Sequence, residues 1–335
     1  MLGGMRGLSK RDRRAAAALL LGAVTFAICV VVGWGTWKLT TLRRFTLDIA
    51  TAADPPAGHF LAHDRGGHVD HHVLLHGMDA DTLRNLQQAD VLLLGNSRLM
   101  FALRGEAVHA YFVTRGLRPF LLGFGHEEQH QFPLEVMRRH RLRPRLVIVN
   151  VDNFFGGVTS AFGERVLRDS RFDAWKTEME ATAAHLVRRR LHQVAPHVPD
   201  LWDGEREFII YRSERDGAWF SATDFGRGGR LQPFYRGRDA LRTHNVQLAR
   251  AFKESVEATG AHVIFVLVPG RDVSLTHAQL LAGAVGVPLV APEVADLRTM
   301  DGSHLTDDSA RRYASVFFQH LDPVLDEVLG AGAVH

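Results

Sequence analysis

The stretch VLLLGNSRLM (residues 91–100) decides how the rest of the chain is interpreted. Four apolar residues in succession end at Gly95, and two polar residues, Asn96 and Ser97, follow. A continuous run of valine and leucine is typical of a parallel strand that is buried on both faces. In an open α/β sheet, ligands bind beyond the carboxyl ends of the strands, so Ser97 is expected at an edge where a site can form. The alternative is that Asn96 and Ser97 only cap a helix.

Apolar runs of strand length recur along the chain, separated by stretches that are typical of helices. They lie at residues 90–95, 119–123, 145–152, 262–269 and 287–292. Residues 239–260 have the spacing of an amphipathic helix that ends in a glycine, and a final helix is expected at about residues 306–329. Strand alternating with helix predicts an α/β fold, a flavodoxin-like three-layer sandwich with about five parallel strands.

Breaks in this alternation divide the chain into segments. Residues 89–330 are expected to form the α/β domain, and residues 156–237, which are rich in arginine and aromatic residues, an inserted cap. The run Arg188 to Arg190 within the cap is interpreted as a solvated helix face, with contact to an anionic or sugar polymer as the alternative.

Residues 38–88 form a polar, histidine-rich lead-in, which we interpret as a solvated linker. Its side chains could instead bind a transition metal, although their spacing matches no defined site. The candidate ligands would be His59, His63, His68, Asp70, His71, His72 and His76.

The N-terminal part predicts a membrane anchor. Residues 15–37 carry no charge and are long enough to cross a bilayer, which takes about 20 apolar residues. More basic residues precede this run than follow it, so the positive-inside rule places residues 1–14 in the cytoplasm and the rest of the chain outside. We expect a single-pass protein of the inner membrane whose α/β domain is periplasmic. A cleaved signal peptide is the alternative, but the run is long and no A-x-A cleavage site clearly follows it.

Composition narrows the class of protein. Of 335 residues, 46% are hydrophobic and 23% are charged, which is typical of a globular protein with a sizeable core. The net charge is only +3, the basic residues are scattered, and no nucleic-acid-binding motif accompanies them, so a nucleic-acid partner is not expected. Cys29 is the single cysteine and lies in the apolar run, so the rest of the chain can form no disulfide. No cofactor and no metal are expected.

A second polar motif, DGSHLTDD (residues 301–308), stands before the last expected helix. Asp301 and His304 are three residues apart, a spacing that lets a carboxylate hold an imidazole across one turn or a tight loop. A serine needs such a base to act as a nucleophile at neutral pH, and the second ring nitrogen could take the proton of Ser97. The alternative is a polar loop in which Thr306 caps the helix.

Together these two motifs resemble those of the SGNH (GDSL-like) hydrolase superfamily. Ser97 in GNSR resembles the first block, where G-D-S is usual, and Asp301-x-x-His304 followed by Leu305 resembles the last block. Within the superfamily, the chain is most similar to the membrane-anchored, extracytoplasmic branch, which includes alginate O-acetylation proteins and the D-alanyl transfer protein of teichoic acid modification. The resemblance implies that Ser97 is the nucleophile, His304 the base and Asp301 its orienting partner.

The second block of the superfamily supplies a glycine of the oxyanion hole after the second strand. In this chain LLGFGH offers Gly123 and Gly125, without the usual asparagine before them. The backbone amide of Ser97 is the further candidate donor, because amide groups at the start of a helix can stabilise negative charge.

The third block is normally G-x-N-D, and here the chain departs from it. The sequence reads Asn150-Val151-Asp152-Asn153, so Asp152 occupies the asparagine position. A carboxylate that faced the developing oxyanion would repel it, whereas Asn153 or Asn150 could donate a hydrogen bond instead. The loss of one oxyanion donor costs about 10²–10³ in rate.

A rival motif, HEEQH (residues 126–130), matches the H-E-x-x-H pattern of zinc proteases, with Glu127 as the base. That pattern requires a sustained helix that places both histidines on one face. Here a strand end precedes the motif and Pro133 follows it closely, so at most its first turn is expected to be helical. A role for His126 in lining the site is the preferred interpretation.

The resemblance implies a membrane-anchored serine esterase or O-acyltransferase that acts on acyl esters of a cell-envelope or exported polysaccharide. Ser97 would form an acyl-enzyme, from which water gives hydrolysis and a sugar hydroxyl gives transfer. The expected partners are the acylated or acceptor polysaccharide, the lipid bilayer around residues 15–37 and a membrane-bound acyltransferase. The alternative is a catalytically degenerate binding or assembly module of a polysaccharide export or modification complex.

Overall fold

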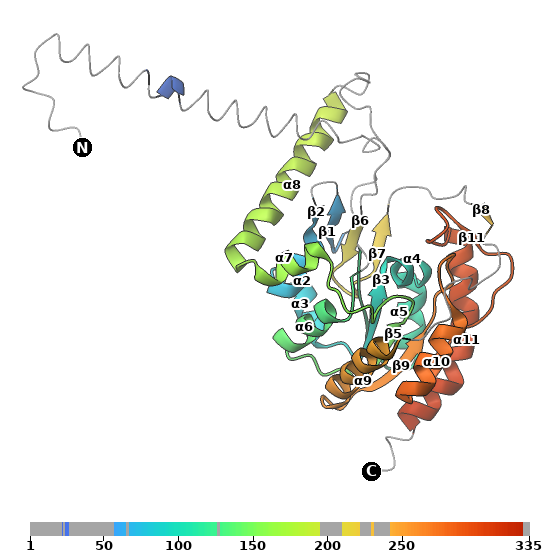
Figure 1. Ribbon diagram of the computed structural model, residues 1–335. Helices are drawn as coiled ribbons and strands as arrows, with labels where there is room; N and C mark the ends of the chain where they lie inside the picture. Colours follow the sequence, from blue (N-terminus) through green and yellow to red (C-terminus); the bar gives the residue numbers. More distant parts are fainter. Residues whose placement is uncertain are drawn as a thin grey trace, which may run out of the picture. The chain divides into compact units, whose positions relative to one another are not determined.

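The computed structural model describes residues 22, 24–26, 57–64, 67–125, 128–194, 210–221, 229–230 and 242–330. The chain divides into two compact units, residues 1–50 with 191–207 and residues 51–190 with 208–335. The second unit contains the sheets and the candidate site (Figure 1).

The predicted membrane anchor, residues 15–37, lies outside the described residues except for residues 22 and 24–26, which are helical. Among the helices that the structure does describe, none combines the length and the apolar character needed to span a bilayer.

The second unit is built around a five-stranded parallel sheet, as the sequence predicts. The strand order is β10-β9-β5-β3-β4, and all four pairings are parallel. The strands are β3 (Val91–Asn96), β4 (Pro119–Phe124), β5 (Leu146–Asn150), β9 (His262–Val266) and β10 (Leu289–Val290). The prediction of an α/β fold with five parallel strands is therefore confirmed, although β10 is shorter than its apolar run.

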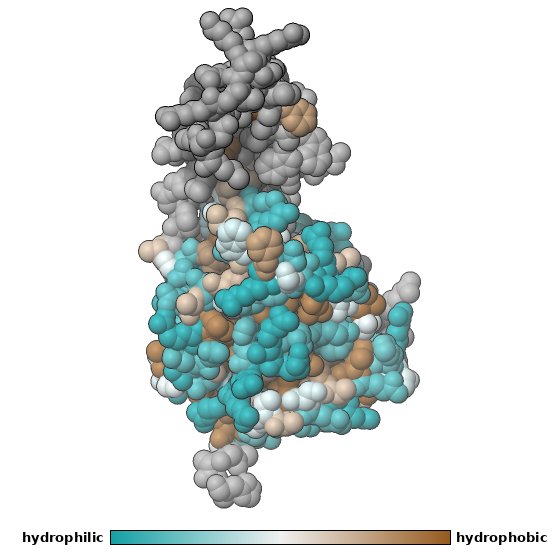
Figure 2. Space-filling model, turned by 90° about the vertical axis from the view of Figure 1, so that its left-hand side faces the viewer, coloured by the Kyte–Doolittle hydropathy of each residue, from teal (hydrophilic) through white to brown (hydrophobic). Residues whose placement is uncertain are grey.

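Helices cover both faces of this sheet, so the fold has three layers, consistent with a flavodoxin-like sandwich (Figure 1). Leu93 of β3 packs into the core on one face, and Leu92 and Leu94 pack into the core on the other. The first face carries α4 (Ser97–Ala102), α5 (Gly105–Val113) and α11 (Asp307–Gly330). The second carries α6 (Gln131–Arg139), α9 (Thr243–Glu257) and α10 (Leu275–Val285). The molecular face in Figure 2 is mainly hydrophilic among its coloured residues, as expected when the apolar side chains lie in these two cores.

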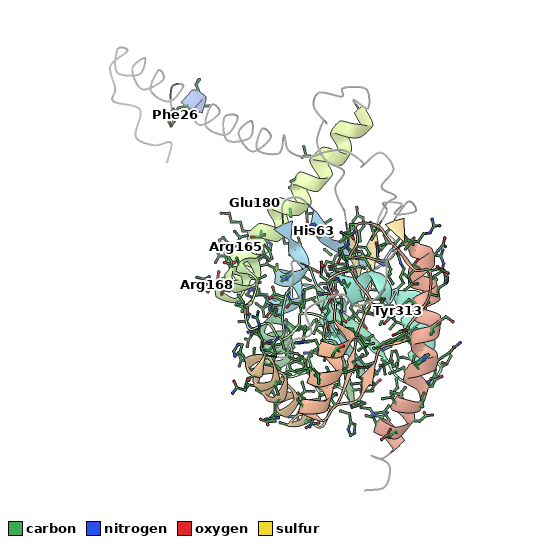
Figure 3. All side chains as sticks on the ribbon, turned by 45° about the vertical axis from the view of Figure 1, so that its right-hand side comes forward. Phe26, His63, Arg165, Arg168, Glu180 and Tyr313 are labelled. Carbon is green, nitrogen blue, oxygen red and sulfur yellow. The ribbon has the colours of Figure 1, made fainter. Side chains whose placement is uncertain are left out.

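The long helix α11 is held against the sheet by a buried hydrogen bond. Tyr313, labelled in Figure 3, is fully buried and donates from its hydroxyl to the carbonyl oxygen of Leu267 at 3.1 Å. Because Leu267 follows β9 directly, this bond fixes the start of α11 close to the carboxyl end of the sheet.

The lead-in is not a solvated linker, so that prediction is wrong for its described residues. It folds into β1 (His59–Asp64), β2 (Gly67–His68), α2 (Val69–His76) and α3 (Ala80–Gln87). Leu74, Leu75 and Leu86 lie in the core beneath the parallel sheet, and His71 and His72 are buried. The α/β unit therefore begins well before the predicted boundary at residue 89.

The segment predicted as a cap joins the lead-in in a second sheet. This sheet has the order β2-β1-β6-β7 and is antiparallel, with β6 (Ile210–Ser213) and β7 (Trp219–Ser221) contributed by the predicted cap. The amide of Leu121 in β4 donates to the carbonyl of Asp216 at 2.8 Å, so the β6–β7 turn lies along the edge strand of the parallel sheet. The remaining elements of the segment are α7 (Ala161–Arg168), α8 (Arg171–Val194) and β8 (Gly229–Arg230), which pairs with β11 (Arg298–Thr299). The side chains of the run 188–190, in α8, lie outside the described residues.

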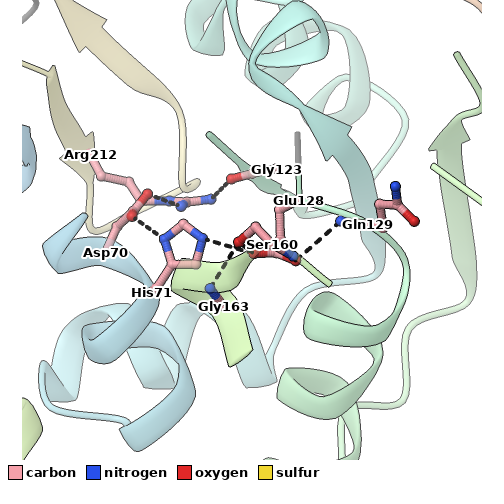
Figure 4. A network of polar contacts seen from close by, with 8 residues as sticks. All are labelled: Asp70, His71, Gly123, Glu128, Gln129, Ser160, Gly163 and Arg212. Atoms are coloured by element: carbon pink, nitrogen blue, oxygen red, sulfur yellow. Dashed lines mark hydrogen bonds and ion pairs between the residues drawn. The ribbon is translucent and has the colours of Figure 1, made fainter. Parts of the chain in front are cut away.

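A buried network of charged side chains joins the lead-in to both sheets (Figure 4). Arg212 of β6 is fully buried and donates to Asp70 at 2.8 Å, and the other oxygen of Asp70 lies 3.0 Å from Nδ1 of His71. Nε2 of His71 lies 3.6 Å from Glu128, which in turn accepts from Ser160 Oγ at 2.5 Å. Charges of opposite sign alternate along the network, and this offsets the cost of burying them.

The second amino group of Arg212 reaches the parallel sheet. It donates to the carbonyl oxygens of Leu121 at 2.6 Å and Gly123 at 3.0 Å, both in β4. The network explains why this polar, histidine-rich segment folds against the sheet, because Arg212 finds its counter-ion in α2 and its remaining acceptors in β4.

Replacement of Arg212 by Met should destabilise the protein strongly, because Asp70 would be left buried without its counter-ion. Breaking a buried pair in this way costs about 3–5 kcal/mol. The measurement is the free energy of unfolding in denaturant. The matched control is Arg118→Met, which breaks an ion pair with Asp90 in which the arginine is 60% exposed, and which should cost no more than about 1 kcal/mol. Equal losses in the two variants would contradict the assigned role of Arg212.

The stability that His71 contributes should depend on pH. Burial would lower the pKa of His71, but its hydrogen bonds and attraction to Asp70 and Glu128 outweigh burial, and the pKa is raised from its ordinary value of 6.5. The contribution of His71 is therefore complete below that ordinary value and is lost as the pH rises through the raised pKa of the folded state.

The pH effect is measured as the difference in unfolding free energy between the wild type and His71→Gln. This difference should be larger at about pH 5.5 than at about pH 9. The wild type alone is not sufficient, because burial lowers the pKa of His72, His76 and His130 and these residues contribute with the opposite sign. A difference that grows with pH would contradict the prediction.

Candidate active site

Ser97 begins α4 immediately after β3, at the carboxyl end of the sheet. Asn96 is the N-cap of this helix, and its side-chain oxygen accepts from the amide of Arg98 at 3.0 Å. The helix approaches the sheet closely at Gly95, where a Cβ atom would lie only 3.0 Å from Cβ of Asn150 and 3.1 Å from the side chain of Leu99. A side chain at this position would crowd both neighbours, so the glycine of GNS allows a tight strand-to-helix turn with the serine at its end.

The structure brings Ser97 and His304 into direct contact, although they are 207 residues apart. Ser97 Oγ lies 2.8 Å from Nε2 of His304, and Nδ1 of His304 lies 2.6 Å from Asp301 Oδ2. The proximity that the two motifs predicted is confirmed. The three side chains form the hydrogen-bonded chain that a serine nucleophile requires.

Asp301 is held in place by the loop that it belongs to. Its second carboxylate oxygen accepts from the backbone amides of Ser303 at 2.8 Å and His304 at 2.9 Å. Burial tends to raise the pKa of Asp301, but the hydrogen bonds from the amide and ring of His304 and from Ser303 outweigh it and lower the pKa below its ordinary value. Asp301 is therefore ionised at neutral pH and can fix the orientation of the imidazole.

The loop that carries Asp301 and His304 is anchored on both sides of the motif. Met300 donates to the carbonyl of His304 at 2.8 Å, and Thr306 donates to the carbonyl of Arg298 at 3.0 Å. The ring of Phe101, in α4, lies edge-on to the ring of His304 with centroids 5.0 Å apart. The position of the imidazole is thus determined by its own loop and by the helix that Ser97 begins.

Arg98 connects the two halves of the site, a role that the sequence did not reveal. Its Nη1 donates to Asp152 Oδ2 at 2.9 Å, and its Nε donates to Ser303 Oγ at 2.8 Å. One guanidinium therefore links the turn after β3, the turn after β5 and the loop before α11. The positions of Arg98 beside Ser97 and of Ser303 beside His304 were the signals available in the sequence.

Asp152 is engaged by its neighbours rather than directed at a substrate. Its carboxylate is only 1% exposed and accepts from Asn96 Nδ2 at 3.0 and 2.9 Å, from Arg98, and from the amide of Asn153 at 2.7 Å. The positive charge of Arg98 offsets the negative charge of Asp152. The sequence suggested that the carboxylate of Asp152 would repel a developing oxyanion. The ion pair with Arg98 reduces this repulsion.

The candidate oxyanion donors differ in burial and in their position relative to Ser97. Asn150 is fully buried in β5 and its side-chain oxygen accepts from Val268, so it is not accessible to a substrate, which corrects its inclusion among the donors. Gly123 is buried inside β4, where a Cβ atom would lie 2.6 Å from Sδ of Met100. In the pairing of β3 with β4, Asn96 lies opposite Phe124. Gly125, which follows Phe124, therefore lies opposite Ser97, which follows Asn96.

Asn153 is exposed in the turn after β5, where its amide donates to Asp152. The backbone amide of Ser97, at the start of α4, and Gly125 and Asn153 thus remain as candidate donors at the edge of the sheet.

The zinc-site alternative gains no support. His126 and Glu127 lie outside the described residues, Glu128 and Gln129 are not helical, and α6 begins only at Gln131. In the part of the chain that is described, no group of three histidine, cysteine, aspartate or glutamate side chains could hold a metal ion. His130 instead packs against Phe155, with ring centroids 5.5 Å apart.

Fold and site together define an α/β protein with a hydrogen-bonded serine–histidine–aspartate set at the carboxyl edge of its parallel sheet. The chain matches no known protein-family model, and no curated protein and no solved structure shows significant similarity to it.

Asp152→Asn tests whether Asp152 supports the site or impairs it. The variant removes the counter-ion of Arg98, so the turn at Ser97 and the loop at Ser303 should lose their common anchor. Small displacements of reacting groups cost up to about 100-fold in rate, and we expect labelling of Ser97 by a fluorophosphonate probe to slow by roughly 10-fold or more. The control is Asp308→Asn, an exposed residue of the same region, which should label at the wild-type rate. Faster labelling of Asp152→Asn would mean that the carboxylate opposes the reaction.

Proposed function

We propose that this protein is an SGNH-type serine esterase or O-acyltransferase that acts on acyl esters of a cell-envelope or exported polysaccharide. The observation that carries the proposal is the continuous hydrogen-bonded chain from Ser97 Oγ through His304 to Asp301. The location of this chain at the carboxyl edge of a parallel sheet supports it further, because ligands bind there in open α/β folds.

Ser97 Oγ attacks the acyl carbonyl, and its proton passes to Nε2 of His304. Asp301, bonded to Nδ1, stabilises the imidazolium that forms. His304 then returns the proton to the oxygen of the departing sugar, which leaves the acyl group on Ser97. Water or the hydroxyl of a second sugar attacks this acyl-enzyme while His304 accepts its proton. The bond between the acyl carbon and Ser97 Oγ then breaks, His304 returns the proton to Ser97 Oγ, and the product is a free acid or a new ester.

The negative charge on the carbonyl oxygen requires hydrogen-bond donors. The backbone amide of Ser97 lies at the N-terminus of α4, where unpaired amide groups favour an anion. Gly125 and Asn153, which follow the neighbouring strands, are the further donors in this proposal. Asp152 acts indirectly, by holding Asn96 and Arg98 on either side of the nucleophile.

The proposal places the α/β unit outside the cytoplasm, attached to the inner membrane by residues 15–37, and near a membrane-bound acyltransferase. The hydrophobic run and its flanking basic residues support this part of the proposal.

A second candidate is a binding or assembly module that keeps the fold without catalysis. The specific observation in its favour is Asp152, which stands where the superfamily has an asparagine donor and is occupied by Asn96 and Arg98.

A fluorophosphonate probe separates the two candidates, because it reacts only with an activated serine. The wild-type protein should be labelled, Ser97→Ala should not be labelled, and Asp301→Asn should react up to about 10⁴-fold more slowly, since its imidazole loses the correct orientation. The readout is the mass of the intact protein with time. The control is Ser255→Ala, an exposed serine of α9 away from the site, which should be labelled at the wild-type rate.

Labelling that survives in Ser97→Ala would locate the reactive serine elsewhere and overturn the proposed mechanism. An unlabelled but folded wild-type protein would favour the binding module.

A further inference from the structure

A groove of about 850 Å³ lies beside the candidate active site. Its walls come from the start of β1, from α3, from the first residues of α5 and from the β6–β7 turn, with Arg311 of α11 at one side. The lead-in and the predicted cap therefore build this groove together, and neither the acyl transfer chemistry nor the buried charge network accounts for it.

Two contacts connect the groove to the catalytic loop. The ring of Phe101 lies edge-on to His304 on one side and edge-on to Trp219 of the groove on the other, with centroid distances of 5.0 and 5.7 Å. Arg104, also in the groove lining, forms an ion pair with Asp307, three residues after His304. A single aromatic ring thus separates the groove wall from the imidazole.

The charges in the groove are balanced. Its lining carries four arginines and four carboxylates, and neighbouring residues such as Arg215 and Asp216 pair directly, at 2.8 Å. Glu106 and Glu214 make no side-chain hydrogen bond or ion pair with other residues in the described part of the chain, so their oxygens remain available as acceptors. The ring of Phe220 is partly exposed and provides an apolar surface.

The composition of a second hollow provides a contrast within the same molecule. It has a volume of about 340 Å³ and its lining includes Arg138, Arg141 and Arg143 and no carboxylate, although Arg138 pairs at 2.7 Å with Glu135 outside the lining. A polyanion would be drawn to such a surface, whereas the groove with balanced charges offers as many repulsive groups as attractive ones.

We propose that the groove binds a neutral segment of the glycan whose acyl ester reacts at Ser97, an inference that rests on the proposed function. Hydroxyl groups both donate and accept, and so they match a lining that carries guanidinium donors and carboxylate acceptors in equal number. Phe220 offers the apolar contact that binding sites combine with a few polar groups. Binding at a distance from the reacting ester positions the ester and contributes to catalysis.

The test is calorimetric titration of the full-length Ser97→Ala protein with oligosaccharides of glucose, mannose, galactose and N-acetylglucosamine, and in parallel with uronate oligosaccharides. At least one neutral oligosaccharide should bind. Phe220→Ala and Glu214→Ala should each raise its dissociation constant by about 10-fold, because each removes one of the proposed contacts. Two chemically different variants are used so that misfolding of one does not decide the result.

The matched control is Phe172→Ala, which removes a more exposed phenylalanine, 67% exposed, from α8, outside the groove. It should bind the same oligosaccharide with the wild-type dissociation constant.

Binding of uronate oligosaccharides alone, binding that neither groove variant weakens, or no binding at all would overturn the inference. Failure of the proposed function is recognised separately. If the wild-type protein reacts with the fluorophosphonate but no oligosaccharide binds, the proposed function stands and the groove proposal is wrong. If an oligosaccharide binds but the wild-type protein is not labelled, the groove binds glycan and the proposed catalytic function is wrong.

Discussion

The guanidinium group of Arg98 is the constraint on which the site depends. It donates to Asp152 after β5 and to Ser303 before α11, while the backbone amide of Arg98 donates to Asn96 at the end of β3. Three segments that are far apart in the sequence therefore meet around one planar cation. Arg98 holds Ser303, the neighbour of His304, through its guanidinium, and Asn96, the neighbour of Ser97, through its backbone amide. The short distance between Ser97 and His304 follows from this arrangement.

The pairing of Asn96 with Asp152 gives the altered blocks a physical meaning. In the SGNH superfamily, whose motifs we propose for this chain, aspartate usually precedes the serine and asparagine occupies the third block. Here the two residue types are exchanged, and a hydrogen bond of 2.9–3.0 Å joins them. The exchange keeps one amide and one carboxylate at the same junction of strands. It also supplies the anion that Arg98 needs.

The sequence was sufficient to predict the parallel sheet and the meeting of Ser97 with His304. Both rest on local signals, namely continuous apolar runs and short polar motifs at strand or helix ends. The folding of residues 57–88 could not be predicted in the same way, because His71 and Asp70 are polar and read as solvent-facing. Their burial depends on Arg212, which is 142 residues away from Asp70. Asn150 was likewise misjudged, because its burial depends on Val268 in a distant loop.

The closed network around Arg212 limits where the protein can be cut without losing its fold. Proteolytic release from the proposed N-terminal anchor leaves the folded unit intact only when cleavage falls before His59, where β1 begins. Cleavage between α2 and β3 would separate Asp70 and His71 from the rest of the unit, so Arg212 would lose its partner Asp70 and Glu128 its partner His71. If the protein is the membrane-attached enzyme that we propose, shedding into the surrounding medium would preserve its activity only when cleavage falls before β1.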